Sequence, residues 1–125
     1  MDVIQLGCGV CGLVCAEHLA QNAKVDRLVL ADSRTDGARA LKTRLGMDKV
    51  SVVEVDGRDR KALVGLLRDM DIVVATMPWR MNRTVMEVAS ETGTDYVDFG
   101  MPFDSTGPDF DRYSEMCRKA GISAL

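Results

Sequence analysis

The 125-residue sequence has no apolar run that approaches the roughly 20 residues that a membrane-spanning helix needs. It has no excess of positive charge either. The net charge is −3 and the pI is near 5.1, which argues against nucleic acid or an anionic membrane as the main partner. The first residues, Met1-Asp2-Val3, lack the basic region that opens a signal peptide. We therefore expect a cytoplasmic protein.

Residues for side-chain catalysis are also scarce. The one histidine, His18, falls on the polar side of a predicted helix, and no Ser/His/Asp or Cys/His arrangement can be assembled. Cys8 and Cys11 have the Cys-x-x-Cys spacing of a metal or redox pair. Because both lie in a glycine-rich turn that requires small side chains, we interpret them as packing residues. We assign no catalytic residue and no metal site.

What the sequence does contain is a glycine motif, Gly7-Cys8-Gly9-Val10-Cys11-Gly12, directly after the apolar segment 3–6. G-x-G-x-x-G between a strand and a helix is typical of dinucleotide-binding domains. Gly7 permits the tight turn, Gly9 lets a pyrophosphate approach the backbone, and Gly12 lets the helix pack closely on the strand. The start of the helix, including Val10 and Cys11, offers N–H groups and a positive dipole end to the phosphates.

An acidic residue follows at the expected distance. Asp32 ends a second apolar segment, about 20 residues after Gly12, where a carboxylate can bind the ribose hydroxyls of NAD. Ser33 and Arg34 could instead hold the 2′-phosphate of NADP. We predict NAD or NADP as the cofactor and favour NAD. The alternative is an ordinary glycine turn with a solvent-exposed aspartate.

Apolar periodicity alternates between the strand and helix patterns along the whole chain. Strands are predicted at 2–6, 27–31, 50–55, 71–75, 96–99 and 122–125, with a helix between each pair and a loop at 100–108. Gly46, Gly93 and Gly121 are predicted helix stops. This order predicts an α/β, doubly wound parallel sheet of three layers. The fold is of the Rossmann type, with strand order 3-2-1-4-5-6, in one domain over 1–125.

Ligands of such sheets bind beyond the carboxyl ends of the strands, where the strand order reverses. This rule adds residues that follow the third and fourth strands to the predicted site: Asp56, Gly57, Thr76, Met77 and Pro78. Asp56 could accept a hydrogen bond from the adenine amino group, and 76–78 should pass near the nicotinamide ribose. Trp79 could wall a substrate pocket or pack in a core or interface. Asp98 could also reach the cleft.

With these residues in place, the chain resembles the N-terminal nucleotide-binding domain of the saccharopine dehydrogenase family over essentially its whole length. The matching segments are the glycine motif, Leu30-Ala31-Asp32-Ser33-Arg34, Val55-Asp56, Asp71-Ile72-Val73-Val74 leading to Pro78, Gly93-Thr94-Asp95-Tyr96-Val97-Asp98, and Ala120-Gly121-Ile122-Ser123-Ala124-Leu125. The resemblance implies an NAD(P)-dependent oxidoreductase that transfers hydride at an amino-acid-derived C–N bond. It also implies that an amino-acid-like substrate is held largely by a second domain. Since that domain is absent here, the resemblance implies that this chain binds cofactor without turnover.

Two other functions use the same motif. Regulatory domains that gate potassium channels and transporters sense a nucleotide with a similar glycine turn and acid, and normally pair as dimers. A dinucleotide-binding domain that has lost catalysis is the other alternative. Oligomeric state would separate the regulatory domain from the enzyme, so we leave a homodimer open as a partner.

Overall fold

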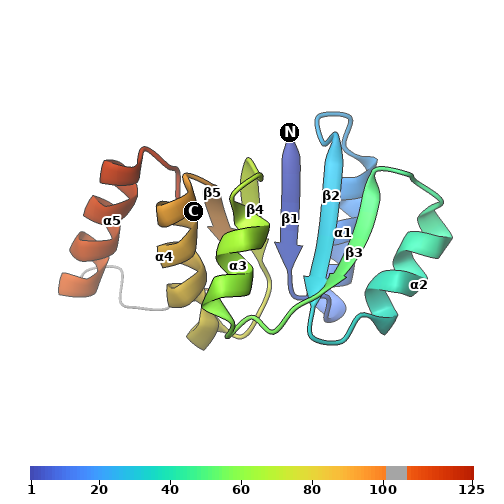
Figure 1. The fold of residues 1–125 in the computed structure, drawn as a ribbon, viewed down its shortest axis with the longest axis horizontal. Coiled ribbons are helices and arrows are strands. Elements are labelled where there is room, and N and C mark those ends of the chain that lie inside the picture. Colours follow the sequence, from blue (N-terminus) through green and yellow to red (C-terminus); the bar gives the residue numbers. More distant parts are fainter. Residues whose placement is uncertain (101–106) are drawn as a thin grey trace.

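Five parallel strands form one sheet in the order β3-β2-β1-β4-β5 (Figure 1) in the computed structural model, which describes residues 1–100 and 107–125. The strands are β1 (Asp2–Leu6), β2 (Arg27–Asp32), β3 (Val50–Glu54), β4 (Ile72–Ala75) and β5 (Asp95–Asp98). The helices are α1 (Val10–Gln21), α2 (Asp36–Leu45), α3 (Arg60–Leu67), α4 (Asn82–Thr92) and α5 (Pro108–Ala120), and a 3-10 turn, Trp79–Met81, precedes α4. The predicted doubly wound α/β fold is confirmed.

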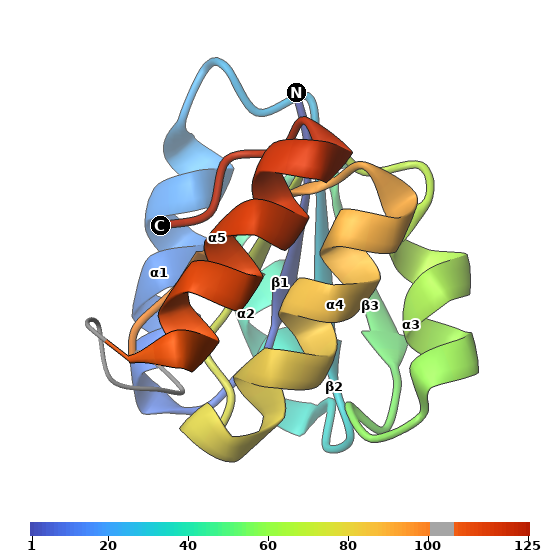
Figure 2. The same ribbon diagram turned by 90° about the vertical axis from the view of Figure 1, so that its left-hand side faces the viewer.

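The helices lie on both faces of the sheet (Figure 2). Ala16 and Ala20 of α1 and Leu41 of α2 pack on one face. Helices α3, α4 and α5 pack on the other, where Leu63 and Val85 are completely buried. Most residues of the central strands are buried whichever face they point to, which is why their sequences are nearly continuous apolar runs.

The predicted sixth strand forms only in part. Tyr96 and Ala124 make an isolated parallel bridge, and the N–H of Asp98 donates to the carbonyl oxygen of Leu125 at 3.0 Å. This segment therefore lies beside β5, at the position that the order 3-2-1-4-5-6 assigns to it. The segment follows the left-handed cap of α5 at Gly121 and forms this isolated bridge rather than a regular strand.

Local signals placed the helix ends well. The helices α2, α4 and α5 end at the predicted glycines, Gly46, Gly93 and Gly121, each with a left-handed backbone. Most of the loop predicted at 100–108 lies outside the described residues. Within residues 1–100 and 107–125, no helix is long and apolar enough to cross a bilayer.

Candidate functional site

A cleft of about 410 Å³ lies at the carboxyl ends of the central strands, where the strand order reverses between β1 and β4. Its volume is within the range of about 300–1,000 Å³ that is usual for ligand pockets. Most of the predicted site residues line it: Gly7, Gly9, Asp32, Ser33, Arg34, Asp56, Gly57, Thr76, Met77 and Pro78. Four further residues line it: Ala31, Val55, Arg58 and Met81.

The other predicted residues, Val10, Cys11 and Gly12, form the first turn of α1 and do not line the cleft. The helix begins after Gly9 without a side-chain cap, so no side chain of the described residues occupies its first N–H groups. Apart from Gly9 itself and its two chain neighbours, no heavy atom of the described residues lies within 4 Å of the point where Gly9 would carry a Cβ. A ligand can therefore approach this backbone closely.

The turn is held tightly from behind by the end of β4. Gly7 has a φ of +97°, and a Cβ there would lie 2.9 Å from the backbone of Thr76. The Thr76 hydroxyl donates to the carbonyl oxygens of Gly7 at 2.6 Å and of Leu6 at 3.2 Å. At Gly12 a Cβ would overlap the carbonyl oxygen of Gly7 and lie 2.7 Å from the Thr76 hydroxyl. The first and third glycines of the motif are thus required by sterics.

Asp32 anchors this turn to the end of β2. Its Oδ2 accepts a hydrogen bond from the N–H of Cys8 at 2.6 Å, and its Oδ1 accepts from the N–H of Arg34 at 2.9 Å and the hydroxyl of Ser33 at 3.3 Å. Partial burial works to raise the pKa of Asp32, but the hydrogen bonds from Cys8 and Arg34 outweigh it and hold that pKa below 3.8. Asp32 is therefore a fixed negative charge at neutral pH.

Two arginines lie on the rim of the cleft. The Arg58 guanidinium makes two hydrogen bonds to the Asp56 carboxylate, both of 3.1 Å, and these lower the pKa of Asp56. Asp56 is thus already engaged. The side chain of Arg34 lines the cleft and makes no hydrogen bond or ion pair with any described residue. The rim therefore presents one paired and one unpaired guanidinium.

The cysteines of the motif occupy different environments. Cys8 is buried, and desolvation followed by the charge of Asp32 raises its pKa to about 11. Such a thiol stays protonated at neutral pH and is a poor nucleophile. Cys11 is exposed on α1. Within the described part of the chain, no group of three or more His, Cys, Asp or Glu side chains could hold a metal ion.

Trp79 and Asp98, which the sequence placed near the site, do not line the cleft. Trp79 is 52% exposed, with the Arg80 guanidinium 4.9 Å from its ring centroid. Asp98 accepts hydrogen bonds from the Tyr96 hydroxyl at 2.6 Å, the Asn82 amide at 2.9 Å and the Gly100 N–H at 2.8 Å. Its carboxylate therefore joins β5 to the start of α4.

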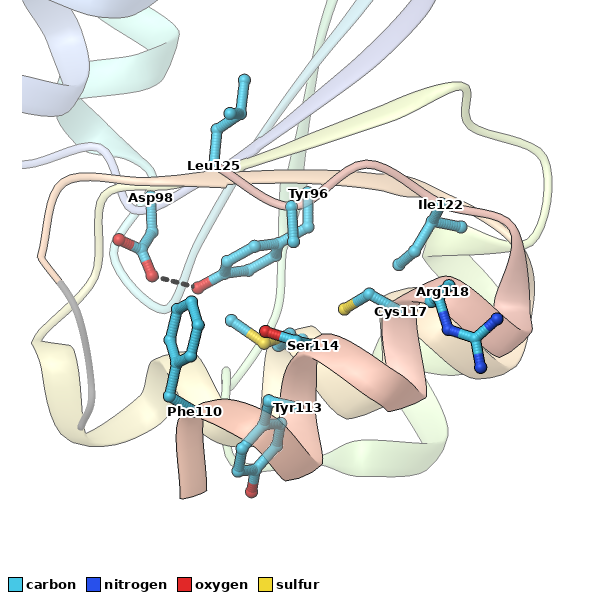
Figure 3. Close-up of a pocket in the computed structure, with 11 residues that line it drawn as sticks. Tyr96, Asp98, Phe110, Tyr113, Ser114, Cys117, Arg118, Ile122 and Leu125 are labelled. Carbon is cyan, nitrogen blue, oxygen red and sulfur yellow. Dashed lines mark hydrogen bonds between the residues drawn. The ribbon is translucent and has the colours of Figure 1, made fainter. Parts of the chain in front are cut away.

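Asp98 instead borders a second hollow, of about 400 Å³, between β5 and α5 (Figure 3). Figure 3 shows the Tyr96 hydroxyl directed at Asp98, and Leu125 pointing away from α5. Most of the lining is aromatic or aliphatic: Met86, Tyr96, Phe110, Tyr113, Ile122, Ala124 and Leu125. Burial, with the hydrogen bond to Asp98, raises the pKa of Tyr96. Periodicity in the sequence does not predict this hollow.

Comparisons with known proteins agree with this geometry. Residues 3–125 match the model of a family described as "Saccharopine dehydrogenase NADP binding domain". A similar solved structure is apo saccharopine dehydrogenase (L-Glu forming) from Saccharomyces cerevisiae, 26% identical, with a TM-score of 0.82 over 98% of this chain and 26% of that chain.

Inositol dehydrogenases share the fold. A putative myo-inositol dehydrogenase from Sinorhizobium meliloti 1021 is 18% identical, with a TM-score of 0.77 over 100% of this chain and 35% of that one. The scyllo-inositol dehydrogenase from Lactobacillus casei is 14% identical, with a TM-score of 0.75 over 99% and 36%. At these identities the likeness shows the fold alone. The present chain spans only about a quarter to a third of the length of these proteins.

Proposed function

Because this chain belongs to the family of the saccharopine dehydrogenase NADP binding domain, as its motifs predicted, we propose that its cleft holds the dinucleotide of a dehydrogenase. The observation that carries the proposal is the turn from Gly7 to Gly12. There an uncapped helix start and the open backbone of Gly9 stand beside a cleft that the ionised Asp32 borders. Backbone N–H groups at a helix start bind phosphate well.

Different parts of the cleft suit different parts of a dinucleotide. The pyrophosphate would lie against Gly9 and the start of α1. The adenosine end would lie between the tips of β2 and β3. There the side chains of Met77 and Met81 pack close against Gly57. When bound, the nicotinamide donates or accepts a hydride. The residues of this chain bind and orient the cofactor.

We propose that both NAD and NADP bind, and that Arg34 holds the 2′-phosphate of NADP. Asp32 favours NAD, since its negative charge disfavours a phosphate nearby. However, its oxygens already accept from Cys8, Arg34 and Ser33, whereas the Arg34 guanidinium makes no hydrogen bond to the described residues. A guanidinium on a cleft rim is suited to a phosphate. The family's description, which names NADP, supports this role.

The reaction we propose is hydride transfer at an amino-acid-derived C–N bond, in a protein whose substrate is held by a second domain. The family model and the yeast neighbour, both named for saccharopine dehydrogenase, support it. We expect this chain alone to bind cofactor without turnover. No observation favours the regulatory nucleotide-sensing alternative.

A titration with NADH and with NADPH tests the proposal. Trp79 is the one tryptophan of the chain and directly follows Pro78, which lines the cleft. Binding should quench Trp79 emission and sensitise that of the reduced nicotinamide, and calorimetry should report one site. If neither technique detects either dinucleotide, the proposed function is wrong.

A further inference from the structure

Gln5 is an exception in the centre of the sheet. It lies on β1 between Leu30 of β2 and Val74 of β4, and it is completely buried. The sequence around it has the pattern of an apolar strand. A buried amide is destabilising unless its polar atoms find hydrogen-bond partners. The partners of the Gln5 amide therefore indicate why a polar residue occupies this position.

The amide of Gln5 is directed at the glycine turn. Its Nε2 donates to the carbonyl oxygen of Gly7 at 3.1 Å and to the carbonyl oxygen of Gly12. One side chain thus joins the first glycine of the motif to the third. Gly12 makes room for it, since a Cβ there would lie 3.0 Å from the Gln5 Nε2.

Neither carbonyl depends on Gln5 for a partner. The Thr76 hydroxyl also donates to the oxygen of Gly7, and the oxygen of Gly12 lies in α1, where the helix ladder supplies an N–H. Meanwhile the Oε1 of Gln5 has no hydrogen-bond partner among the described residues. An unpaired buried acceptor is destabilising. An apolar residue of the same shape would therefore suit the core at least as well.

We infer that Gln5 is a positioning residue, which holds the turn from Gly7 to Gly12 in the shape that receives the pyrophosphate. This inference rests on the proposed function. It predicts that stability and binding respond in opposite directions when the amide is removed. A residue that merely supported the fold would change both in the same direction.

Gln5→Met keeps the shape of the side chain and removes the amide. We expect a melting temperature equal to or above that of the wild type. We also expect about tenfold weaker binding of ADP-ribose, the order expected when one or two hydrogen bonds are lost. Adenosine, which has no pyrophosphate, should bind within about twofold of its wild-type affinity. Isothermal calorimetry of both ligands and a thermal melt supply these values.

Val3→Ala is the matched control. Val3 lies two residues earlier on β1, it packs in the same core as Ala16 of α1, and its apolar side chain can donate no hydrogen bond to the turn. This variant should melt at a lower temperature and bind ADP-ribose as the wild type does. Gln5→Asn, whose amide is one methylene shorter, is a second test of reach and should also weaken ADP-ribose binding.

A second readout needs no ligand. The N–H of Gly7 donates to Ala31 at 2.8 Å and that of Cys8 donates to Asp32. In Gln5→Met we expect these two amides to exchange with solvent about tenfold faster than in the wild type, as locally weakened hydrogen bonds do. In Val3→Ala the exchange of the Gly7 and Cys8 amides should not increase more than that of other amides in the core.

Unchanged ADP-ribose affinity with unchanged exchange at Gly7 and Cys8 would overturn the inference. So would an equal loss of adenosine and ADP-ribose binding, because Gln5 would then support the whole cleft. If the wild type binds no dinucleotide, the proposed function fails. The exchange comparison still decides whether Gln5 positions the turn.

Discussion

The two hollows of this domain have nearly the same volume and opposite chemistry. The cleft at the strand ends, of about 410 Å³, is bordered by glycine backbone, the ionised Asp32 and the Arg34 guanidinium, which has no partner in residues 1–100 and 107–125. The hollow between β5 and α5, of about 400 Å³, is walled largely by apolar and aromatic side chains, and the polar pair Tyr96–Asp98 is bonded internally (Figure 3). Volume alone does not distinguish them. The backbone N–H groups at the uncapped start of α1 and the Arg34 guanidinium, which has no partner among the described residues, distinguish them and support our proposal that the cleft holds the phosphates of a dinucleotide.

The largest effect should follow from Gly12→Ala, which fills the space behind the turn. The new Cβ would overlap the carbonyl oxygen of Gly7, so the backbone must shift. We expect the free energy of unfolding to fall by about 3 kcal/mol, as for severe overpacking. Dinucleotide affinity should fall by roughly 100-fold or more, since the phosphate site is displaced. Thermal denaturation and calorimetry measure the two effects.

Gly65→Ala is the control for this change. Gly65 is exposed on α3, and outside its own helix backbone no heavy atom of the described residues lies within 4 Å of its would-be Cβ. Alanine there should raise the free energy of unfolding by up to about 1 kcal/mol, because glycine is a poor helix former. Binding should not change. Wild-type affinity in Gly12→Ala would refute the cleft as the phosphate site.

Asp32→Asn is expected to rank next. The substitution replaces one carboxylate oxygen with an NH₂ group, which cannot accept the hydrogen bond from the N–H of Cys8 or of Arg34. One of the hydrogen bonds that Asp32 makes at the end of β2 is therefore lost. We expect a loss of about 1–2 kcal/mol in the free energy of unfolding. Binding of NADH should weaken by about tenfold, and binding of NADPH by less, because the charge that disfavours the 2′-phosphate is removed as well. Asp48→Asn, which removes the same charge from an exposed turn, should leave both within error.

The pH dependence of this variant sharpens the test. Because the pKa of folded Asp32 lies below its ordinary value of 3.8, its stabilising contribution is present above that value and lost as the pH falls through the folded pKa. The stability gap between the wild type and Asp32→Asn should be constant from about pH 5 to 7 and close below about pH 4. A gap that widens towards acid would contradict this account.

Arg34→Ala should produce a smaller and more selective effect. It removes the one guanidinium of the rim that has no partner among the described residues. NADPH affinity should fall by about tenfold and NADH affinity by less than about twofold, since a charge-assisted bond to the 2′-phosphate is lost. NADH is the internal control. An equal loss for both would assign Arg34 to a part of the cofactor that the two share.

The smallest effect on binding should come from the hollow of Figure 3. Tyr96→Phe removes the hydrogen bond to Asp98, which keeps its bonds from Asn82 and Gly100. The free energy of unfolding should fall by about 1 kcal/mol, the net value of one buried hydrogen bond. Dinucleotide affinity should stay within about twofold. A tenfold loss of affinity would show that the two hollows are coupled.

The fold and most of the cleft could be predicted from the sequence because their signals are local. The glycine stops and apolar runs define the elements, and the parallel order brings the strand ends, with Asp32 and Thr76, to one edge. The sixth strand was predicted at the position where the segment pairs with β5, although the structure forms an isolated bridge there rather than a regular strand.

The contacts behind the turn could not be predicted. The Thr76 hydroxyl meets the carbonyl oxygen of Gly7 across 69 positions of sequence, and no periodicity encodes that approach. The role of Gln5 does not emerge from the sequence, because one polar residue does not alter an apolar strand pattern. Asp32 was predicted to meet a ribose, and its hydrogen bond to Cys8 emerged only from the folded turn.

Amide chemical-shift mapping with NADPH, on the isotopically labelled chain, tests the central claim most directly. We predict that the largest shifts fall on Gly7, Gly9 and Gly12 and on the tip of β2 at Asp32, with none at Tyr96 and the other residues of the hollow between β5 and α5. Shifts concentrated around that hollow, or no shifts at saturating NADPH, would contradict the account.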